Sequence, residues 1–136
     1  MRVYVAGPVG ETSTVRAIQD AVVDAGHELT LDWSRQDDSS LSDYASAPEV
    51  SSRIAVQDLR AVLAADAVLI AASGPGGRGM FVELGAALSR AEHGQLDHLV
   101  VIGAVHDDSV FFYHPAVQRV ATVQAWLATT TSDCLG

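Results

Sequence analysis

The feature that most constrains the fold is an uninterrupted apolar run at residues 66–73, DAVLIAAS. A strand with one face in solvent alternates between polar and apolar residues, whereas a strand covered on both faces stays apolar along its length. A glycine-rich stretch and then a helical pattern follow this run. The run therefore predicts a central strand of a parallel sheet that has helices on both faces.

Strand and helix patterns alternate along the rest of the chain. Strands are expected at residues 2–7, 27–33, 66–73 and 98–103, with a short fifth strand inside 116–130. Helices are expected at residues 11–26, 50–65 and 80–94, and a last helix is expected at the end of 116–130. The apolar side of the helix at 50–65 consists of Ala55, Leu59, Val62 and Leu63. This order predicts an α/β fold: a single Rossmann-like or flavodoxin-like domain over residues 1–136, with a mainly parallel five-stranded sheet and helices on both faces.

Composition excludes several classes of partner. Eight Lys and Arg face 17 Asp and Glu, giving a formal net charge of −9. This balance argues against a nucleic-acid polymer, although backbone amides can still hold a small anion. The single cysteine allows no intramolecular disulfide, the N-terminal residues do not resemble a signal peptide, and no apolar run reaches the roughly 18 residues of a membrane span. We therefore expect a cytoplasmic protein without a membrane partner.

A glycine-rich loop, SGPGGRG at residues 73–79, lies where a parallel sheet places its ligands, beyond the carboxyl end of a strand. Its free amides at the start of a helix indicate either a cradle for phosphate, sugar or carboxylate, or a flexible turn. No Lys-Ser or Lys-Thr pair follows, and the G-x-G-x-x-G order is absent. The loop is therefore neither a Walker-type nor a dinucleotide-binding loop.

Three side chains stand out as candidates for chemistry. Glu83 lies about four residues into the helix after the loop, and we expect the helix dipole to hold it ionised, as suits a nucleophile. The alternative is an ordinary helix-start glutamate. Asp58 lies between apolar helical turns and is expected near either a ligand or a partner. Tyr4 either packs in the core or forms a hydrogen bond through its hydroxyl group. None of the five histidines has metal-ligand spacing, so we expect no metal and no cofactor.

Three segments carry a family resemblance: VYVAGPVG, AVQDLRAVLAADAVLIAA and GRGMFVELGAAL. They resemble the nucleoside 2-deoxyribosyltransferase superfamily, which includes deoxynucleoside 5′-monophosphate N-glycosidases and cytidylate hydrolases, over about residues 2–125. Residues 75–83, PGGRGMFVE, are also similar to the P-G-G-x-G-T-x-x-E motif of cytokinin-activating phosphoribohydrolases, with Met80 in place of the threonine. Both resemblances imply cleavage of an N-glycosidic bond.

The resemblance implies a role for each candidate. Glu83, before Leu-Gly, becomes the nucleophile that attacks the anomeric carbon; Asp58 positions the sugar or nucleophile and handles protons; Tyr4 orients Glu83. Trp33 and the loop at residues 34–49 are expected to cover the base, the alternative for Trp33 being core packing. The expected substrate-binding residues are Gly7, Pro8, Trp33, Ser73, Gly77, Arg78 and Gly79.

The chain also departs from the family pattern. Pro8 stands where the hydrolases have a phosphate-binding serine. The C-terminal Asn and the terminal aromatic residue or Met of the transferases are absent. The phosphate partners that remain plausible are Ser13, Ser73, Arg16 and Arg78. We therefore expect an N-glycosidase that acts on a nucleoside or nucleoside 5′-monophosphate with water as acceptor. The alternatives are a nucleoside 2-deoxyribosyltransferase and a non-catalytic nucleotide-binding sensor. The resemblance further implies a homodimer or larger homo-oligomer, with which exposed apolar residues at 110–112 are compatible.

Overall fold

Five parallel strands form the centre of the molecule. The structure is a computed structural model that describes residues 1–36 and 41–135, with side chains described through residue 130. In spatial order the strands are β2 (Glu28–Leu29), β1 (Arg2–Ala6), β3 (Ala67–Ala71), β4 (His98–Ile102) and β5 (Val117–Val120). Every described strand pair is parallel, and the order is that of a flavodoxin-like doubly wound sheet, which confirms the predicted fold class.

The apolar run that predicted a central strand occupies the middle of the sheet. All five residues of β3 are buried, and β3 pairs with β1 on one side and β4 on the other. The register places Val68 between Tyr4 and Leu99. A strand in this position has no solvent-facing side, which explains why its sequence does not alternate.

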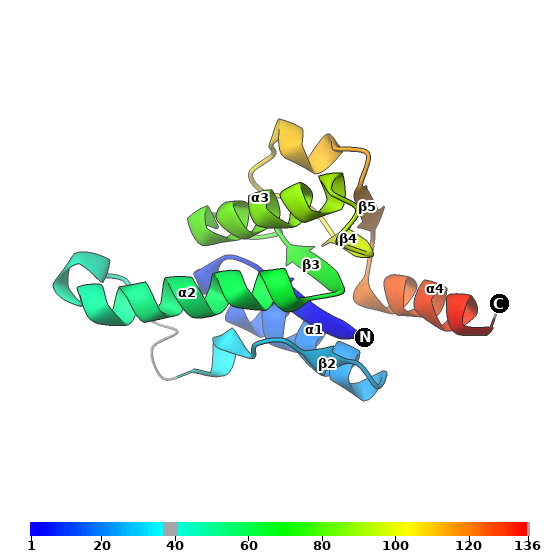
Figure 1. Ribbon diagram of the computed structural model, residues 1–136, viewed down its shortest axis with the longest axis horizontal. Coiled ribbons are helices and arrows are strands. Elements are labelled where there is room, and N and C mark those ends of the chain that lie inside the picture. The colour runs from blue at the N-terminus through cyan, green and yellow to red at the C-terminus, as the bar shows by residue number, and fades with distance from the viewer. Residues whose placement is uncertain (37–40, 136) are drawn as a thin grey trace.

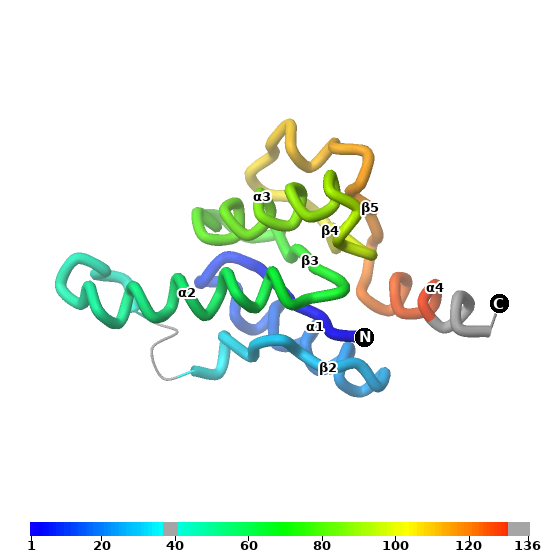
Figure 2. Tube along the Cα trace, in the orientation of Figure 1, coloured from blue at the N-terminus to red at the C-terminus, as the bar shows by residue number. Residues whose placement is uncertain are grey.

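Two layers of helices cover the sheet (Figures 1 and 2). α2 (Pro48–Ala64) and α3 (Arg78–Glu92) lie side by side on one face, where they pack against residues such as Tyr4 and Val68. α1 (Thr12–Asp24) and α4 (Val123–Leu135) cover the other face, against Val3, Val5 and Leu69. Successive residues of a strand point to opposite faces, so one strand supplies both cores.

The second strand is shorter than predicted. The strand was expected over residues 27–33, but β2 spans only Glu28–Leu29, followed by one further ladder bond from the Thr30 amide to the Val3 carbonyl, 2.9 Å. The next acceptor along β1, the Val5 carbonyl, binds the indole Nε1 of Trp33 at 2.7 Å instead of a backbone amide. The side chain thus takes the place of a backbone donor, and the chain turns away into the short 3₁₀ helix η2 (Trp33–Arg35).

Helix α2 does not bury the side that its sequence pattern indicated. Val62 is fully buried, but Leu59 and Leu63 are 43% and 51% exposed. Only the last turns of α2 rest on the sheet, so its outer side has no covering element within the described residues.

The apolar residues 110–112 lie in the 3₁₀ helix η4 (Val110–Tyr113) and differ in burial. The first two are exposed, whereas Phe112 is buried against the α2–α3 layer.

No helix within the described ranges combines the length and the apolar character that crossing a membrane requires.

Candidate active site

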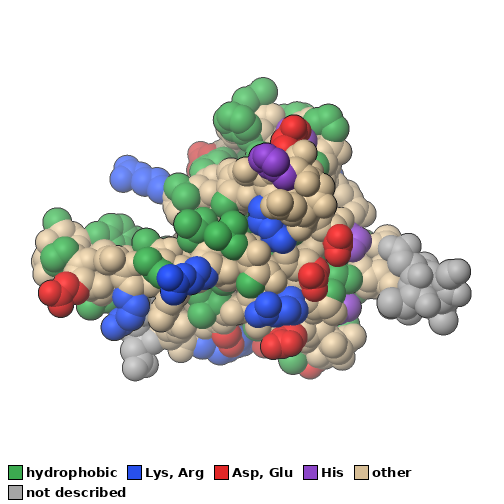
Figure 3. Space-filling view, viewed as in Figure 1, with side chains coloured by type: hydrophobic (Ala, Val, Ile, Leu, Met, Phe, Trp, Pro, Cys, Tyr) green, Lys and Arg blue, Asp and Glu red, His purple; other side chains and the backbone are tan. Residues whose placement is uncertain are grey.

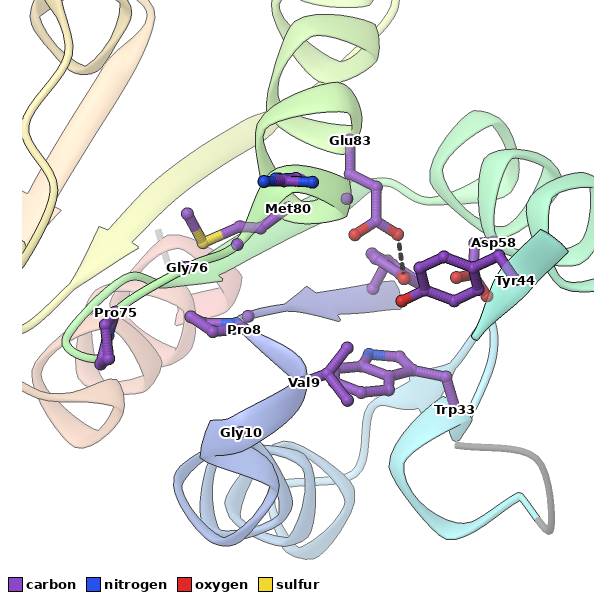
Figure 4. Close-up of a pocket in the computed structure, with 15 residues that line it drawn as sticks. Pro8, Val9, Gly10, Trp33, Tyr44, Asp58, Pro75, Gly76, Met80 and Glu83 are labelled. Carbon is purple, nitrogen blue, oxygen red and sulfur yellow. Dashed lines mark hydrogen bonds between the residues drawn. The ribbon is translucent and has the colours of Figure 1, made fainter. Parts of the chain in front are cut away.

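A pocket of about 510 Å³ opens at the carboxyl ends of β1 and β3 (Figure 4). The strand order reverses between these two strands, because β2 lies on one side of β1 and β3 on the other. The segments that leave the two strands therefore diverge, and doubly wound sheets bind ligands in the crevice between them. The pocket walls come from the loops after β1 and β3, from residues after β2, and from α2 and α3.

Tyr4 and Glu83 meet inside this pocket. Tyr4 is 1% exposed and faces the α2–α3 layer, because its neighbours Val3 and Val5 pack on the opposite face of the sheet. Glu83 lies in the second turn of α3 and is 9% exposed. The Tyr4 hydroxyl donates a hydrogen bond to Oε2 of Glu83 (Figure 4). This bond fixes the orientation of the carboxyl group.

Burial dominates the protonation of Glu83. The pKa of Glu83 is raised to about 8: desolvation is the largest cause, the hydrogen bond from Tyr4 lowers the pKa, and the charge of Asp58 contributes to the rise. The expectation that the helix dipole keeps Glu83 ionised is therefore wrong. The dipole acts within the first turn, whereas Glu83 lies beyond it in a site where the carboxylate has lost its water.

Tyr4 keeps its proton over the whole physiological range. Burial raises the pKa of Tyr4 far above its ordinary value, and the nearby charges of Glu83 and Asp58 raise this pKa further. The hydroxyl is therefore always a donor to Glu83. A permanent donor favours the carboxylate form of its partner, which is the form a nucleophile requires.

Asp58 reaches the same pocket from α2. Its side chain is half-buried, lines the cavity, and lies close enough for its charge to affect the pKa of both Tyr4 and Glu83. Two carboxyl groups and one phenol thus converge from β1, α2 and α3. Two carboxyl groups with coupled protonation are suited to general acid and base work.

The glycine-rich loop forms the opposite wall. Gly76 and Gly77 have positive φ angles of +87° and +92°, a conformation that residues with a Cβ rarely adopt. Gly77 is the N-cap of α3, and its carbonyl accepts a hydrogen bond from the Phe81 amide at 2.9 Å. The turn places residues 76–79 in the cavity wall, and Arg78 among them is exposed.

The loop after β1 approaches its neighbours closely. A Cβ on Gly7 would lie 2.7 Å from Cγ2 of Val15 and 3.1 Å from the Ala71 carbonyl oxygen, so a side chain would not fit. Glycine here lets the end of β1 pass between α1 and β3. The following residues Pro8, Val9 and Gly10 then line the pocket.

Two aromatic residues flank Asp58. Trp33 is half-buried and is held by its bond to the Val5 carbonyl, and Tyr44 belongs to the 3₁₀ helix η3 (Tyr44–Ser46) and is 55% exposed. Figure 4 shows both rings on the side of the pocket where Asp58 lies, away from Pro75 and Gly76. This arrangement gives the pocket an aromatic end and a glycine-loop end, with Glu83 between them.

The structure brings together nine of the ten candidate residues predicted from the sequence. Ser73 is the exception: it is exposed and does not line the pocket. Of the loop at 34–49, residues 37–40 lie outside the described part of the chain, so its predicted covering role stays a prediction. The nine residues in the pocket wall are Tyr4, Gly7, Pro8, Trp33, Asp58, Gly77, Arg78, Gly79 and Glu83.

Six further lining residues were not among the ten candidates, although Gly76 lies in the loop whose amides were expected to cradle a ligand. Pro75, Gly76 and Met80 belong to the glycine-rich motif, and Val9 and Gly10 to the loop after the first strand, so their neighbours could have indicated them. Tyr44 lies in a polar, irregular stretch with no periodicity, and no sequence signal marks it. Among the described side chains, no group of three or more His, Cys, Asp or Glu could hold a metal ion.

Comparison with known proteins shows a shared fold. No protein-family model matches the chain, and no curated protein matches it in sequence. Among solved structures, the chain is similar to the CMP N-glycosidase BcmB of Clostridium botulinum, with a TM-score of 0.57 over 96% of this chain and 98% of that one. The identity is 15%, so the likeness shows the fold alone. In fold, the resemblance inferred from the sequence motifs is confirmed.

Proposed function

We propose that this protein is an N-glycosidase that cleaves the base–sugar bond of a nucleoside or nucleoside 5′-monophosphate, with Glu83 as nucleophile. The observation that carries this proposal is the buried Glu83 carboxyl group, bound by Tyr4 and coupled to Asp58 inside a 510 Å³ pocket. A cavity of this size suits a small ligand such as a nucleoside. The fold shared with a CMP N-glycosidase supports the assignment.

The two ends of the pocket suggest how a nucleoside lies in it. Aromatic rings bind a planar base by stacking, and Trp33 and Tyr44 supply such rings at the end near Asp58. The glycine-loop end then receives the 5′ side of the sugar. The anomeric carbon joins base and sugar and would lie near Glu83, which is between the two ends.

The first chemical step needs one proton on the Glu83–Asp58 pair. With the proton on Asp58, the Glu83 carboxylate attacks the anomeric carbon, the carbon–nitrogen bond breaks, and the departing base takes the Asp58 proton. The product is a glycosyl ester of Glu83. The Tyr4 hydroxyl stabilises the carboxylate that attacks in this step and is released in the next.

Water completes the reaction. The Asp58 carboxylate accepts a proton from a water molecule, whose oxygen attacks the anomeric carbon and displaces Glu83. The free sugar leaves, and the pair again holds one proton. Asp58 therefore acts as the acid in the first step and as the base in the second, whereas Glu83 is first the nucleophile and then the leaving group, as in retaining glycosidases.

The direct test is the release of free base. Matched ribo- and deoxyribonucleosides and their 5′-monophosphates are incubated with the protein, and free base is measured by chromatography. Wild-type protein should release base, and Glu83→Gln, which keeps an acceptor for Tyr4, should lower turnover by ~10³-fold or more. Circular dichroism and thermal unfolding check that the variant is folded; full activity in folded Glu83→Gln would refute the proposal.

The same assay separates the two alternatives. A new nucleoside formed when a second base is added would identify a deoxyribosyltransferase. If no base is released but a ligand raises the melting temperature, the protein is a nucleotide-binding sensor.

We also propose that two copies associate through the α2–α3 layer. Val56, Leu59 and Leu63 are each at least 43% exposed there, and Figure 3 shows hydrophobic side chains along α2 and between α2 and α3. α2 and α3 together hold four Arg and four acidic residues, so this layer has no formal net charge in a protein of net charge −9. Two copies can therefore meet at this layer with less repulsion than elsewhere.

A further inference from the structure

The loop between β4 and β5, residues 103–116, reaches the glycine-loop end of the pocket. Its His106 amide donates a hydrogen bond to the Ala72 carbonyl at 2.8 Å, just beyond the end of β3. This backbone bond holds the following residue, Asp107, beside the turn that begins at Gly74. The position of Asp107 is therefore set by the backbone and not only by the conformation of its own exposed side chain.

Asp107 accepts a hydrogen bond from a backbone amide of the glycine-rich loop. Its Oδ2 accepts a hydrogen bond from the Gly76 amide at 3.2 Å, and Nδ1 of His106 lies 3.3 Å from the same oxygen. Gly76 lines the pocket. An amide of the kind that would cradle a phosphate thus already binds a carboxylate of the same chain.

A second carboxylate lies behind the loop. A Cβ built on Gly74 would lie 2.3 Å from Oε1 of Glu11, so the Glu11 carboxyl group packs directly against this glycine. Glu11 and Asp107 come from the segments after β1 and β4 and flank the loop from two directions.

The residues expected to hold a phosphate are mostly directed elsewhere. Ser13 and Ser73 are exposed and do not line the pocket, and Arg16 donates through Nη2 to the Ser34 carbonyl at 2.6 Å. Arg78 is the one cationic side chain among the described residues that line the cavity. A phosphate carries about −1.5 to −2 charges at pH 7. At this end of the pocket it would have one arginine in the wall, whereas the Asp107 carboxylate lies on the Gly76 amide and the Glu11 carboxylate lies behind the loop.

Resting on the proposed function, we propose that the substrate is a nucleoside with a free 5′-hydroxyl, and that Asp107 is the specificity-determining residue that excludes a 5′-phosphate. A hydroxyl can donate a hydrogen bond to a carboxylate, whereas a phosphate dianion has no proton to donate and is repelled. The phosphate would also have to displace Asp107 from the Gly76 amide. The protein therefore differs in substrate class from an enzyme that acts on CMP.

The experiment compares kcat/KM for matched pairs of nucleoside and 5′-monophosphate in four proteins. Asp107→Asn removes the charge but keeps an acceptor for Gly76, and Asp107→Ala removes both. Asp108→Asn is the matched control, because Asp108 is also exposed but accepts from the Tyr113 hydroxyl at 2.7 Å instead of from the loop. Circular dichroism verifies the fold of each variant.

Wild-type protein should prefer the nucleoside. The ratio of kcat/KM for monophosphate to that for nucleoside should rise about tenfold or more in Asp107→Ala and less in Asp107→Asn, and stay within about twofold in Asp108→Asn. The wild-type preference should also weaken as salt is added, since the Asp107 side chain is 53% exposed. A wild-type preference for the monophosphate, or equal effects at Asp107 and Asp108, would overturn the inference.

A binding measurement separates this inference from the proposed function. If none of the four proteins releases base, the glycosidase proposal fails. Calorimetry with the same pairs of nucleoside and 5′-monophosphate then shows which of the two each protein binds. Binding of the nucleoside by wild-type protein, with the monophosphate bound only when Asp107 is replaced, would support the exclusion. Binding of the monophosphate by wild-type protein at least as tightly as the nucleoside, or of neither ligand, would reject it.

Discussion

At the scale of single residues, the charge of Asp58 affects the protonation of Glu83 by raising its pKa. Each step of the proposed mechanism needs one proton on the two carboxyl groups, and burial raises the pKa of Glu83 to about 8. The kcat/KM of the wild-type protein should therefore fall as the pH rises above about 8. A profile of kcat/KM against pH measures this descending limb directly.

Two substitutions should change this profile in different ways. Tyr4→Phe removes the hydrogen bond that lowers the pKa of Glu83, so this pKa rises and the descending limb moves to higher pH. Asp58→Asn removes the proton donor and also the charge that raises the pKa of Glu83. The residual activity of Asp58→Asn should then increase with pH, because only the Glu83 carboxylate is still required.

The pH profiles also test the assignment of roles. A merely structural Tyr4 would lower activity without moving the limb, and an Asp58 that only positions the sugar would leave the shape of the profile unchanged. Either result would contradict the role proposed for that residue. Thermal unfolding at each pH excludes loss of structure as the cause.

At the scale of single elements, α4 depends on one aromatic side chain. Trp126 is fully buried between α4 and the sheet, and its ring lies 5.7 Å from that of His98 in an edge-on arrangement. Its indole Nε1 is buried without a hydrogen-bond partner among the described residues. The ring therefore stabilises the fold through its apolar contacts and not through its polar atom.

Trp126→Ala should lower the free energy of unfolding by ~3–5 kcal/mol, because it leaves a large cavity under α4. Trp126→Phe keeps an aromatic ring and removes the unpaired donor, so it should cost less than half as much. Urea unfolding followed by circular dichroism measures both changes. Equal losses in the two variants would contradict the expectation that a smaller aromatic ring retains most of this packing.

At the scale of the whole molecule, charge and apolar surface are separated. The α2–α3 layer is formally neutral, so the net charge of −9 comes from the rest of the chain. The layer also exposes Leu63 by 51% and Leu59 by 43%. An apolar, neutral face on a strongly acidic molecule is the face most suited to contact between copies.

Leu63→Glu should shift the protein toward the monomer. The new charge would have to be buried in the contact, which is costly for an unpaired carboxylate. Sedimentation equilibrium should give a mass near twice 14.3 kDa for the wild-type protein and near 14.3 kDa for the variant. Val23→Glu, on the outer side of α1, is the matched control, since Val23 is 50% exposed on the opposite layer. A monomeric wild-type protein would refute the proposed contact.

The sequence by itself determined the elements and most of the pocket wall. The apolar run of β3 indicates burial on both faces, and the glycines at 76 and 77 indicate a turn that only glycine forms readily. Glu83, Asp58 and Tyr4 could be singled out as candidates because each is a polar group in an otherwise apolar pattern. These signals are local, and local patterns are what a sequence shows directly.

The tertiary structure alone decided what these residues do to one another. Tyr4 and Glu83 are 79 positions apart, and Gly76 and Asp107 are 31 apart. Their contacts follow from the order of the strands and the crossings between them, which no short pattern encodes. Burial then reversed the protonation expected for Glu83, and the β4–β5 loop brought Asp107 to an amide expected to hold phosphate. Desolvation and long-range contact are properties of the assembled fold, because both depend on which segments pack together.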